Sequence, residues 1–449
     1  MGLPDFASSV ILGPWLEEYT EFASRLPQNE PAALAQLRNR AISRFKQNGF
    51  PSTDLEAWRT TDVSEIARTP FKRVPGTKAN LSPVDVVPFS YVMCGELVFI
   101  NGHYSPSFSS ICDLPDDAFL GNLNDAIRTV PDKVQTHLGG YATIDDNAFA
   151  TLNTAFIKDG AFLYIPRGTV MKEPIHLLYL SSVSDEATVS WPRNLIVVGE
   201  ESQVTIIESY AGPERGKYLT CPVTEIVAGA GAEIEHYKIQ HESLDATHIA
   251  TQHIYLSQRS KVTSQSMSFG GGFCRNDIGT TLNGEGADCT LNGLYLKRGD
   301  QFIDNHITVE HTRPDCRSFQ LYKGILEERS RAVFSGLIHV HPDAQLTSAE
   351  QSNRNLLLSR DARVNSQPQL LIFADDVKCT HGSTVGELDQ EALFYLQSRG
   401  IGLEEARSLL IYAFANEFIE RVEFSPVRKD LEEFLFNRLP HGDIIKEAK

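Results

Sequence analysis

The sequence predicts a mainly β fold: a right-handed parallel β-helix, which is a solenoid of stacked coils, flanked by N-terminal and C-terminal α-helical regions. Between about residues 155 and 385, short runs of strand-forming residues follow one another without an intervening amphipathic helical pattern. The turns in this region recur at a spacing much longer than that of a hairpin. A long period without helices between the strands is typical of a solenoid.

The turns that set this period each end in a small residue after a polar or glycine-rich corner. By subtraction, successive corners lie 30, 28, 27 and 29 residues apart, at Ser202, Ala232, Ser260, Ala287 and Cys316. Ala332 and Ala362, again 30 residues apart, extend the series. A β-sandwich is the alternative, but its strands recur every 8 to 12 residues or so without a longer period.

The individual strands are predicted from runs rich in β-branched and aromatic residues. An early strand at 97–100 ends in Asn101–Gly102, a dipeptide typical of tight turns. The main region contributes further strands at 162–165, 175–180, 195–198, 204–208, 234–239, 253–256, 291–296, 306–309, 332–340 and 370–373.

Helical patterns at both ends complete the predicted organisation. One helix is predicted to begin at Pro14, and a second runs from Pro31 to a stop at Gly49. The chain is thus divided into an N-terminal helical and mixed α/β region (1–150), a β-helix core (151–386) and a C-terminal helical domain (387–449).

Three helices are predicted in the C-terminal domain, at 390–398, 403–422 and 430–438, and Pro426 ends the second. The second helix has a wide apolar face whose residues are spaced three or four apart. This face either packs on the β-domain or binds a partner. Its members are Leu403, Ala406, Leu410, Phe414 and Phe418.

The composition excludes several classes of function. A net charge of -17 argues against nucleic-acid binding and against an anionic membrane surface. No apolar run approaches the roughly 18 residues that span a bilayer, and the first residues do not resemble a signal peptide. The seven cysteines include no Cys-x-x-Cys, which excludes a zinc ribbon, a thioredoxin motif and a ferredoxin-type run. This pattern predicts a reducing cytoplasm and mostly buried thiols.

No self-contained catalytic arrangement is recognisable in the sequence. Residues 212–218 imitate a phosphate-binding loop, but one spacer residue is missing and Tyr218 replaces the hydroxyl residue that binds magnesium. The histidines lack the spacing of a cupin metal site, so we interpret them as structural or surface residues. They are His236, His241, His248, His253, His339 and His341.

The most informative segment is 373–386, in which Cys379 precedes His381 by two residues and follows Asp375 and Asp376. In an extended chain, the thiol and the imidazole point to the same face, and both suit iron or zinc. Two protein ligands cannot close a tetrahedral metal site. The pair is therefore either a structural coincidence or half of a site that another chain completes.

Three motifs that are far apart in the chain belong to one pattern. They are Val-Lys-Cys-Thr-His-Gly at 377–382 within a longer match at 356–401, Gly-Phe-Pro-Ser-Thr-Asp-Leu-Glu-Ala-Trp-Arg-Thr-Thr-Asp at 49–62, and Leu-Val-Phe-Ile-Asn-Gly at 97–102. Together they resemble the SufB/SufD family of iron–sulfur cluster assembly proteins, and its SufD branch in particular.

The resemblance implies a non-enzymatic scaffold subunit that pairs with the paralogue SufB and docks the ATPase SufC on its C-terminal helices. In that family, the Cys and His of the motif lie at the SufB interface, where the nascent cluster forms. Carried onto this chain, His381 is the first candidate ligand and Cys379 is a second ligand or sulfur acceptor, with Thr380 in place of the commoner Ser. The cluster would be transient, and no cofactor would be bound stably by this chain alone.

Other interpretations stay open at this point. The chain could be a SufB-type principal scaffold, or it could pair with itself when SufB is absent. An enzyme of the β-helix class that uses a metal at Asp375, Asp376 or the histidines is a further alternative.

Lys378 is expected to lower the pKa of the neighbouring Cys379 thiol.

Overall fold

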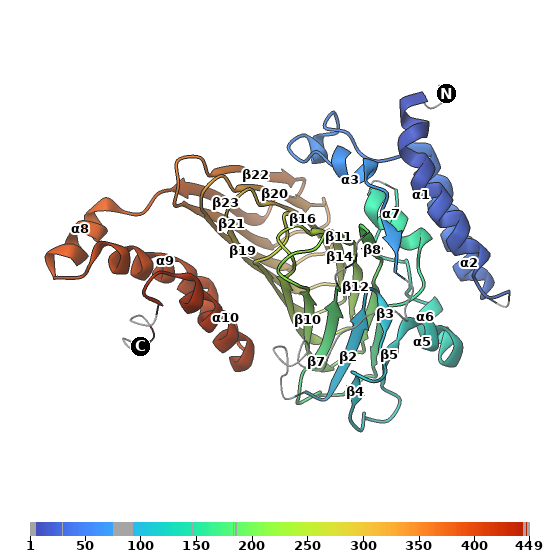
Figure 1. The fold of residues 1–449 in the computed structure, drawn as a ribbon. Helices are drawn as coiled ribbons and strands as arrows, with labels where there is room; N and C mark the ends of the chain where they lie inside the picture. Colours follow the sequence, from blue (N-terminus) through green and yellow to red (C-terminus); the bar gives the residue numbers. More distant parts are fainter. Residues whose placement is uncertain are drawn as a thin grey trace.

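The computed structural model describes residues 6–442 except 29, 75–92, 146, 183 and 185, and also describes residue 446. Its long strands stack into two sheets, and the chain passes from one sheet to the other and back (Figure 1). The predicted mainly β solenoid with helices at both ends is confirmed. None of the helices in the described part of the chain is long and apolar enough to cross a membrane.

The first sheet is parallel throughout its long strands, except where β5 meets β6. In spatial order it contains β22 (Arg363–Ile372), β20 (Arg331–Val340), β18 (Phe302–His311), β16 (Phe273–Leu282), β14 (Thr247–Leu256), β12 (Val223–Ala228), β9 (Arg193–Val198), β6 (Ala161–Ile165) and β5 (Phe119–Asn122). The short strands β1 (Lys72–Arg73), β8 (Thr188–Ser190) and β11 (Tyr218–Thr220) lie beside this path.

The second sheet is built in the same way, with antiparallel partners only on β2. It contains β23 (Val377–Gly386), β21 (Thr347–Leu357), β19 (Arg317–Leu326), β17 (Asp288–Lys297), β15 (Lys261–Ser268), β13 (Glu233–His241), β10 (Gln203–Ala211), β7 (Ile175–Leu180), β2 (Gly95–Ile100) and β3 (His103–Tyr104), with β4 (Ser110–Ile111) also on β2.

The strand register explains the period seen in the sequence. Gln203 lies opposite Glu233, Glu233 opposite Lys261, and Lys261 opposite Asp288, so one coil separates these neighbours. The predicted corner residues directly precede the strands of the second sheet and are fully buried: Ser202, Ala232, Ser260, Ala287 and Cys316. A small side chain is needed there because the chain turns inward against the coil below.

The extension of this series to Ala332 and Ala362 is wrong. Ala332 lies inside β20 and is paired with Val364, whereas Ala362 directly precedes β22. Because Arg331 pairs with Arg363, the residue equivalent to Ala362 on the previous coil is Ser330. Both positions belong to the first sheet, whose corners follow their own spacing.

The N-terminal helices are α1 (Phe6–Ser24), α2 (Ala32–Asn48), the 3-10 helix η1 (Glu56–Trp58), α3 (Ser64–Arg68), α5 (Leu123–Thr129), α6 (Pro131–Gln135) and α7 (Ala148–Ala155). The prediction for α2 is confirmed: it follows Pro31 and ends at Gly49, which has a φ of 64°. The prediction for α1 is wrong at its start, because Pro14 lies inside that helix.

The C-terminal helices are α8 (Gln390–Ser398), α9 (Leu403–Ile419) and α10 (Ser425–Arg438). The bounds of α8 match the prediction, and Gly400, with a φ of 89°, follows its end. Pro426 lies in the first turn of α10, so it begins that helix and does not end α9. This placement suits proline, because the first turn requires no backbone N–H donor.

Helices cover the outer faces of both sheets (Figure 1). On the second sheet, Phe418 of α9 and Leu431 of α10 share an apolar core with Tyr237. On the other side of the solenoid, Trp58 and Phe149 pack with residues of β11 and β14. The end of the solenoid formed by β22 and β23 is the part that these helices leave open (Figure 1).

Candidate functional site

The candidate site lies on β23, the last strand of the second sheet. Both β23 and β22 occupy the terminal position of their sheets, so among the described residues each has one strand edge without a neighbour. Neither strand contains a fully buried residue, whereas the preceding strands β20 and β21 alternate between buried and partly exposed positions. One side of the last coil therefore packs on the coil formed by β20 and β21, and its other side is left open by the described part of the chain.

Cys379 lies on the side of β23 that faces into the solenoid. It is paired with Ala349 on β21 and contacts the apolar group formed by Ile338, Val340 and Ala374. The thiol is half-buried, and this burial raises its pKa above the ordinary value, while a hydrogen bond with the Ala349 backbone partly offsets the effect.

The expectation that Lys378 lowers the Cys379 pKa is therefore wrong. Successive residues of a strand point to opposite faces, so the ammonium group of Lys378 lies on the other side of β23. In this chain alone the thiol is protonated near neutral pH, and a closer positive charge or a metal ion is needed to form the thiolate.

His381 follows on the same face of β23, opposite Gln351. The ring is exposed, and the described residues offer it no hydrogen bond or ion pair. Beneath it, the Gln351 side chain is buried and donates to Gln320 at 3.1 Å, while its Oε1 atom has no partner among the described groups. The imidazole is thus free to bind a ligand that approaches from the open end.

The next inward residue, Ser383, shows how the two terminal strands are held together. Its hydroxyl donates to that of Ser366 on β22 at 2.8 Å, and Ser366 donates to the buried Asn353 at 2.8 Å. Cys379, His381 and Ser383 therefore form one row along the same face of β23, at the open end of the solenoid. The sequence prediction that thiol and imidazole share a face is confirmed by this register.

Asp375 and Asp376 precede the row in a turn. The Asp376 carbonyl accepts from the Leu346 N–H at 2.7 Å, and its own N–H donates to Gln345 Oε1 at 3.0 Å. These contacts give Asp376 a role in shaping the entry to β23. In the part of the chain that is described, no three or more His, Cys, Asp or Glu side chains form a group that could hold a metal ion.

Exposed apolar side chains surround the row, a feature that the sequence alone did not reveal. Phe373 is 60% exposed at the end of β22, where its ring makes an edge contact with His339. The others at this end of the solenoid are Leu346, Leu371, Ile372 and Val385. Apolar patches on a surface commonly mark a protein interface.

The remaining histidines singled out in the sequence are mostly placed in the fold as structural residues. His236 contacts Glu208 at 3.3 Å and His248 contacts Glu242 at 2.7 Å, all in the solenoid interior. His253 is bonded to Thr281 at 3.2 Å. The rings of His339 and His341 lie with their centroids 4.2 Å apart and their planes tilted by 32°.

The predicted apolar face of α9 packs mainly on the solenoid. Ala406 and Phe418 are fully buried, and Leu410 and Phe414 are half-buried against the same core. Leu403 is 48% exposed. Ala406 and Phe418 therefore hold the helix to the second sheet, and the surface left for a partner is on α8 and the start of α9, where Phe394 and Tyr395 are exposed.

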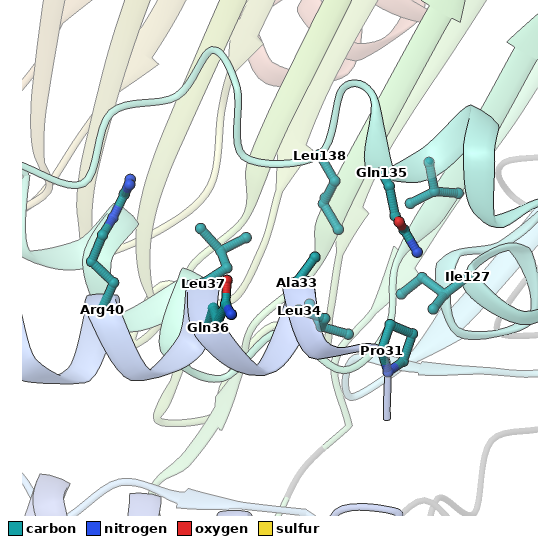
Figure 2. A pocket seen from close by; sticks show the side chains of 10 residues that line it. Pro31, Ala33, Leu34, Gln36, Leu37, Arg40, Ile127, Gln135 and Leu138 are labelled. Atoms are coloured by element: carbon teal, nitrogen blue, oxygen red, sulfur yellow. The ribbon is translucent and has the colours of Figure 1, made fainter. Parts of the chain in front are cut away.

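A separate groove lies between α2 and the segment that contains α5 and α6 (Figure 2). It encloses about 330 Å³ and is lined mainly by apolar side chains such as Leu34, Leu37 and Ile127. Arg40, Gln36 and Gln135 are its polar residues, and no thiol, imidazole or carboxylate lines it. The groove has no group suited to metal or acid–base chemistry, so the site on β23 is the stronger candidate.

Comparison with known proteins identifies the family. A model of the SufBD core domain of the SUF system for FeS cluster assembly matches residues 180–414, and a model of the SufBD N-terminal region matches residues 13–177. An iron–sulfur cluster assembly SufBD family protein of Synechocystis is 34% identical over 412 residues, which cover 90% of this chain and 91% of the relative. SufD of Escherichia coli is 29% identical over 445 residues, covering 98% and 99% of the two chains.

SufD of Bacillus subtilis is 25% identical over 421 residues, covering 92% of this chain and 96% of the relative. Both models describe one class of protein, the SufBD proteins of the SUF system for iron–sulfur cluster assembly. The chain belongs to the SufBD family, and it is homologous to the SufD proteins of Escherichia coli and Bacillus subtilis.

Proposed function

We propose that this chain is a non-catalytic scaffold subunit, which pairs with a SufB paralogue at its open solenoid end and carries the SufC ATPase on its C-terminal helices. In this role it admits iron and helps to form a nascent iron–sulfur cluster at the interface. The cluster is cargo that passes through the complex. The seven free thiols of the chain suit the reducing cytoplasm, where we place this work.

The observation that carries the proposal is the position of Cys379 and His381 at an uncovered end of the solenoid. No strand in the described part of the chain pairs with the outer edges of the terminal strands β22 and β23, and proteins normally protect such edges with charges or covering elements. Here the edges are flanked by Phe373 and Val385, both exposed apolar residues. A partner with a similar solenoid would cover the apolar side chains and could continue the sheets by strand pairing.

The chemistry of the pair also calls for a partner. One thiol and one imidazole provide two ligands, whereas iron–sulfur clusters and tetrahedral metal ions take three or four from their proteins. A second chain docked at this end would supply the missing thiolates. The His381 imidazole binds iron first, and Cys379 loses its proton when the metal arrives, because metal binding favours the thiolate. When SufB is absent, the same apolar end would allow two copies of this chain to pair.

The surface for SufC is formed by α8 and the start of α9. Phe394 is 72% exposed and Tyr395 is 57% exposed, although the rest of the helical domain is well packed on the second sheet. Leu403, at the start of α9, is also exposed. This patch is separate from the site on β23, so both partners can bind at once.

The test is to co-express the chain with SufB and SufC, purify the complex without oxygen, and measure iron and acid-labile sulfide. The variants are His381→Ala and Cys379→Ala, and the matched control is Thr380→Ala, which lies between them on the opposite face of β23. We expect His381→Ala to lose most of the iron and sulfide, Cys379→Ala to lose part of it, and Thr380→Ala to retain it.

Assembly is checked on the same samples by size-exclusion chromatography. Loss of iron and sulfide from an intact complex supports a direct role of this chain in cluster formation. If both variants form the complex and bind as much iron and sulfide as the control, the cluster chemistry lies entirely on the partner and the proposed role of the row is refuted.

A further inference from the structure

Two cysteines far from Cys379 lie opposite each other at the other end of the second sheet. Cys94 directly precedes β2, and Cys112 directly follows β4. The two strands are antiparallel, with Gly95 paired with Ile111, so the register places the cysteines in the next opposing position. The Cys112 N–H donates to the Cys94 carbonyl at 2.9 Å, which fixes this pairing.

The spacing of such a pair allows a disulfide. Opposing residues of antiparallel strands have Cα atoms about 4.5 to 5.5 Å apart, within the range of about 4.4 to 6.8 Å over which disulfides form. The Cys94 N–H donates to the Pro174 carbonyl at 3.0 Å, so Cys94 is held on its other side as well. Cys112 lies after a strand of two exposed residues and has more freedom to adjust.

The two thiols differ in their surroundings. Cys94 is 6% exposed and packs in the solenoid core, whereas Cys112 is exposed to solvent. Burial, followed by a hydrogen bond between the two thiols and by the negative charges that Cys112 and Glu173 can carry, raises the Cys94 pKa to about 12. Cys94 therefore stays protonated near neutral pH, and Cys112 is the thiol that an oxidant in solution reaches first.

The other thiols differ from this pair. Cys274 lies between His248 and Ile303 in the register, Cys289 between Val262 and Ser318, and Cys379 opposite Ala349. None of these three has a cysteine on the neighbouring strand, and the remaining two thiols, Cys221 and Cys316, are buried and lie outside the strands. Cys94 and Cys112 therefore stand out by their direct opposition and by the accessibility of one member.

We propose that Cys94 and Cys112 form a reversible dithiol–disulfide site, which is oxidised by peroxides and restored by small thiols. It goes beyond the assembly function and does not depend on it, because β2 and β23 lie at opposite ends of the second sheet (Figure 1). Disulfides in reducing compartments are usually transient and regulatory, which suits a pair with one exposed thiol.

The reaction balances with hydrogen peroxide as the oxidant. The Cys112 thiolate attacks one peroxide oxygen, the O–O bond breaks, and the products are a sulfenic acid on Cys112 and hydroxide, which takes a proton to give water. The Cys94 sulfur then attacks the Cys112 sulfur, the S–O bond breaks, and hydroxide leaves with the Cys94 proton as a second water. The two sulfurs together lose two electrons, and a thiol reductant returns them.

A disulfide between Cys94 and Cys112 would hold β4 on β2, near the end of the second sheet. β3 and β4 are both antiparallel partners of β2, and both lie in the chain between the two cysteines. A bond from Cys94 to Cys112 closes this segment into a loop and prevents β4 from leaving β2. Oxidation should therefore slow amide exchange in β2 and β4 without changing the far end of the solenoid.

The test treats the reduced full-length chain with hydrogen peroxide, blocks the remaining thiols with N-ethylmaleimide, and maps disulfides without reduction. Cleavage between the two cysteines is essential, and cleavage after Glu96 achieves it because it leaves Cys94 and Cys112 on separate peptides. We expect a linked pair of peptides that contains Cys94 and Cys112 and separates on reduction. Cys112→Ser should abolish it, and the control Cys379→Ser should not.

A second readout follows the fate of Cys112. In Cys94→Ala the sulfenic acid has no neighbour to react with, so Cys112 should proceed to sulfinic acid faster than it does in the wild type. If the wild type accumulates sulfinic acid at Cys112 as fast as Cys94→Ala, or shows no linked peptides, the proposal is overturned. Should Cys94→Ala not fold, the peptide map of the wild type and Cys112→Ser decides the question.

Discussion

The guanidinium of Arg275 lies over the ring of Trp58, 3.8 Å from its centroid. Both residues are buried, and Arg275 also donates to the Ala57 carbonyl at 2.9 Å. The same guanidinium forms ion pairs with Asp277 and Asp304 on β16 and β18. The motif at 49–62 carried only a family resemblance in the sequence. In the structure, its contacts with Arg275 hold the N-terminal region to the solenoid.

Truncation of the Trp58 side chain should lower the free energy of unfolding. Trp58→Ala is expected to destabilise the chain by about 3 to 5 kcal/mol, because it leaves a cavity beside Phe149 and removes the aromatic face from a buried cation. Urea unfolding followed by circular dichroism measures the change. The neighbouring control, Arg59→Ala, replaces an exposed residue and should stay within about 0.5 kcal/mol of the wild type. Equal stability of the two variants would contradict this role of Trp58.

Two glycines in the second sheet make room for tyrosine rings on the neighbouring strand. Gly324 is paired with Tyr295, and Gly293 is paired with Tyr322. A Cβ at Gly324 would overlap the Tyr295 ring and the Asn355 amide. Gly324→Ala should therefore cost about 1 to 3 kcal/mol in unfolding free energy through overpacking.

The matched control is Gly382→Ala on β23, where an added Cβ meets nothing within 4 Å. It should leave the melting temperature of the isolated chain unchanged. A loss of stability in Gly382→Ala as large as that in Gly324→Ala would contradict the role of the tyrosine rings, since backbone entropy favours alanine over glycine in a strand.

The period of the solenoid could be predicted from sequence because corner geometry demands a small buried residue once per coil. Several strands could not, since their inward side chains are polar: β15 has the sequence Lys-Val-Thr-Ser-Gln-Ser-Met-Ser, and β21 is rich in Ser, Gln and Asn. These residues pair with like residues on adjacent coils, as Gln351 does with Gln320. Such ladders stabilise the stacked strands. A single strand of this kind lacks the alternation of apolar and polar residues by which a strand is recognised in a sequence.

For the candidate site, the sequence predicted the shared face of Cys379 and His381 but not its setting. The exposure of Phe373 and Val385 depends on β22 and β23 being the last strands of their sheets, and no local pattern encodes that position. The prediction that Lys378 lowers the Cys379 pKa was wrong because residues adjacent in a strand point to opposite faces. Likewise, the periodic face of α9 could be recognised, but not that the second sheet would cover it.

The interior histidine His311 should make stability depend on pH. Its ring is fully buried on β18, with Nε2 bonded to Ser318 at 2.9 Å, and burial lowers its pKa from about 6.5 to about 4. The folded chain keeps the ring neutral, while the unfolded chain binds a proton below about pH 6.5. Stability is therefore fully present above that pH and falls by up to about 3 kcal/mol as the pH drops toward 4.

Urea unfolding of the wild type and of His311→Asn between pH 7 and about pH 4.5 measures this contribution. Asparagine retains a polar side chain but does not titrate, so the difference in unfolding free energy between the two proteins should shrink as the pH falls. Parallel curves over this range would show that His311 is already accessible to protons in the folded chain.

The C-terminal helices offer a prediction that separates partner binding from folding. Phe394→Asp and Leu403→Asp change exposed side chains, so they should abolish co-purification with SufC and leave the melting temperature unchanged. Phe418→Ala is the opposite case: its ring is fully buried against the second sheet, and its loss should cost about 3 to 5 kcal/mol. Leu410→Asp is a poorer probe, because this half-buried side chain contributes to the same core. Retention of SufC by the folded Phe394→Asp and Leu403→Asp variants would place the ATPase on another surface.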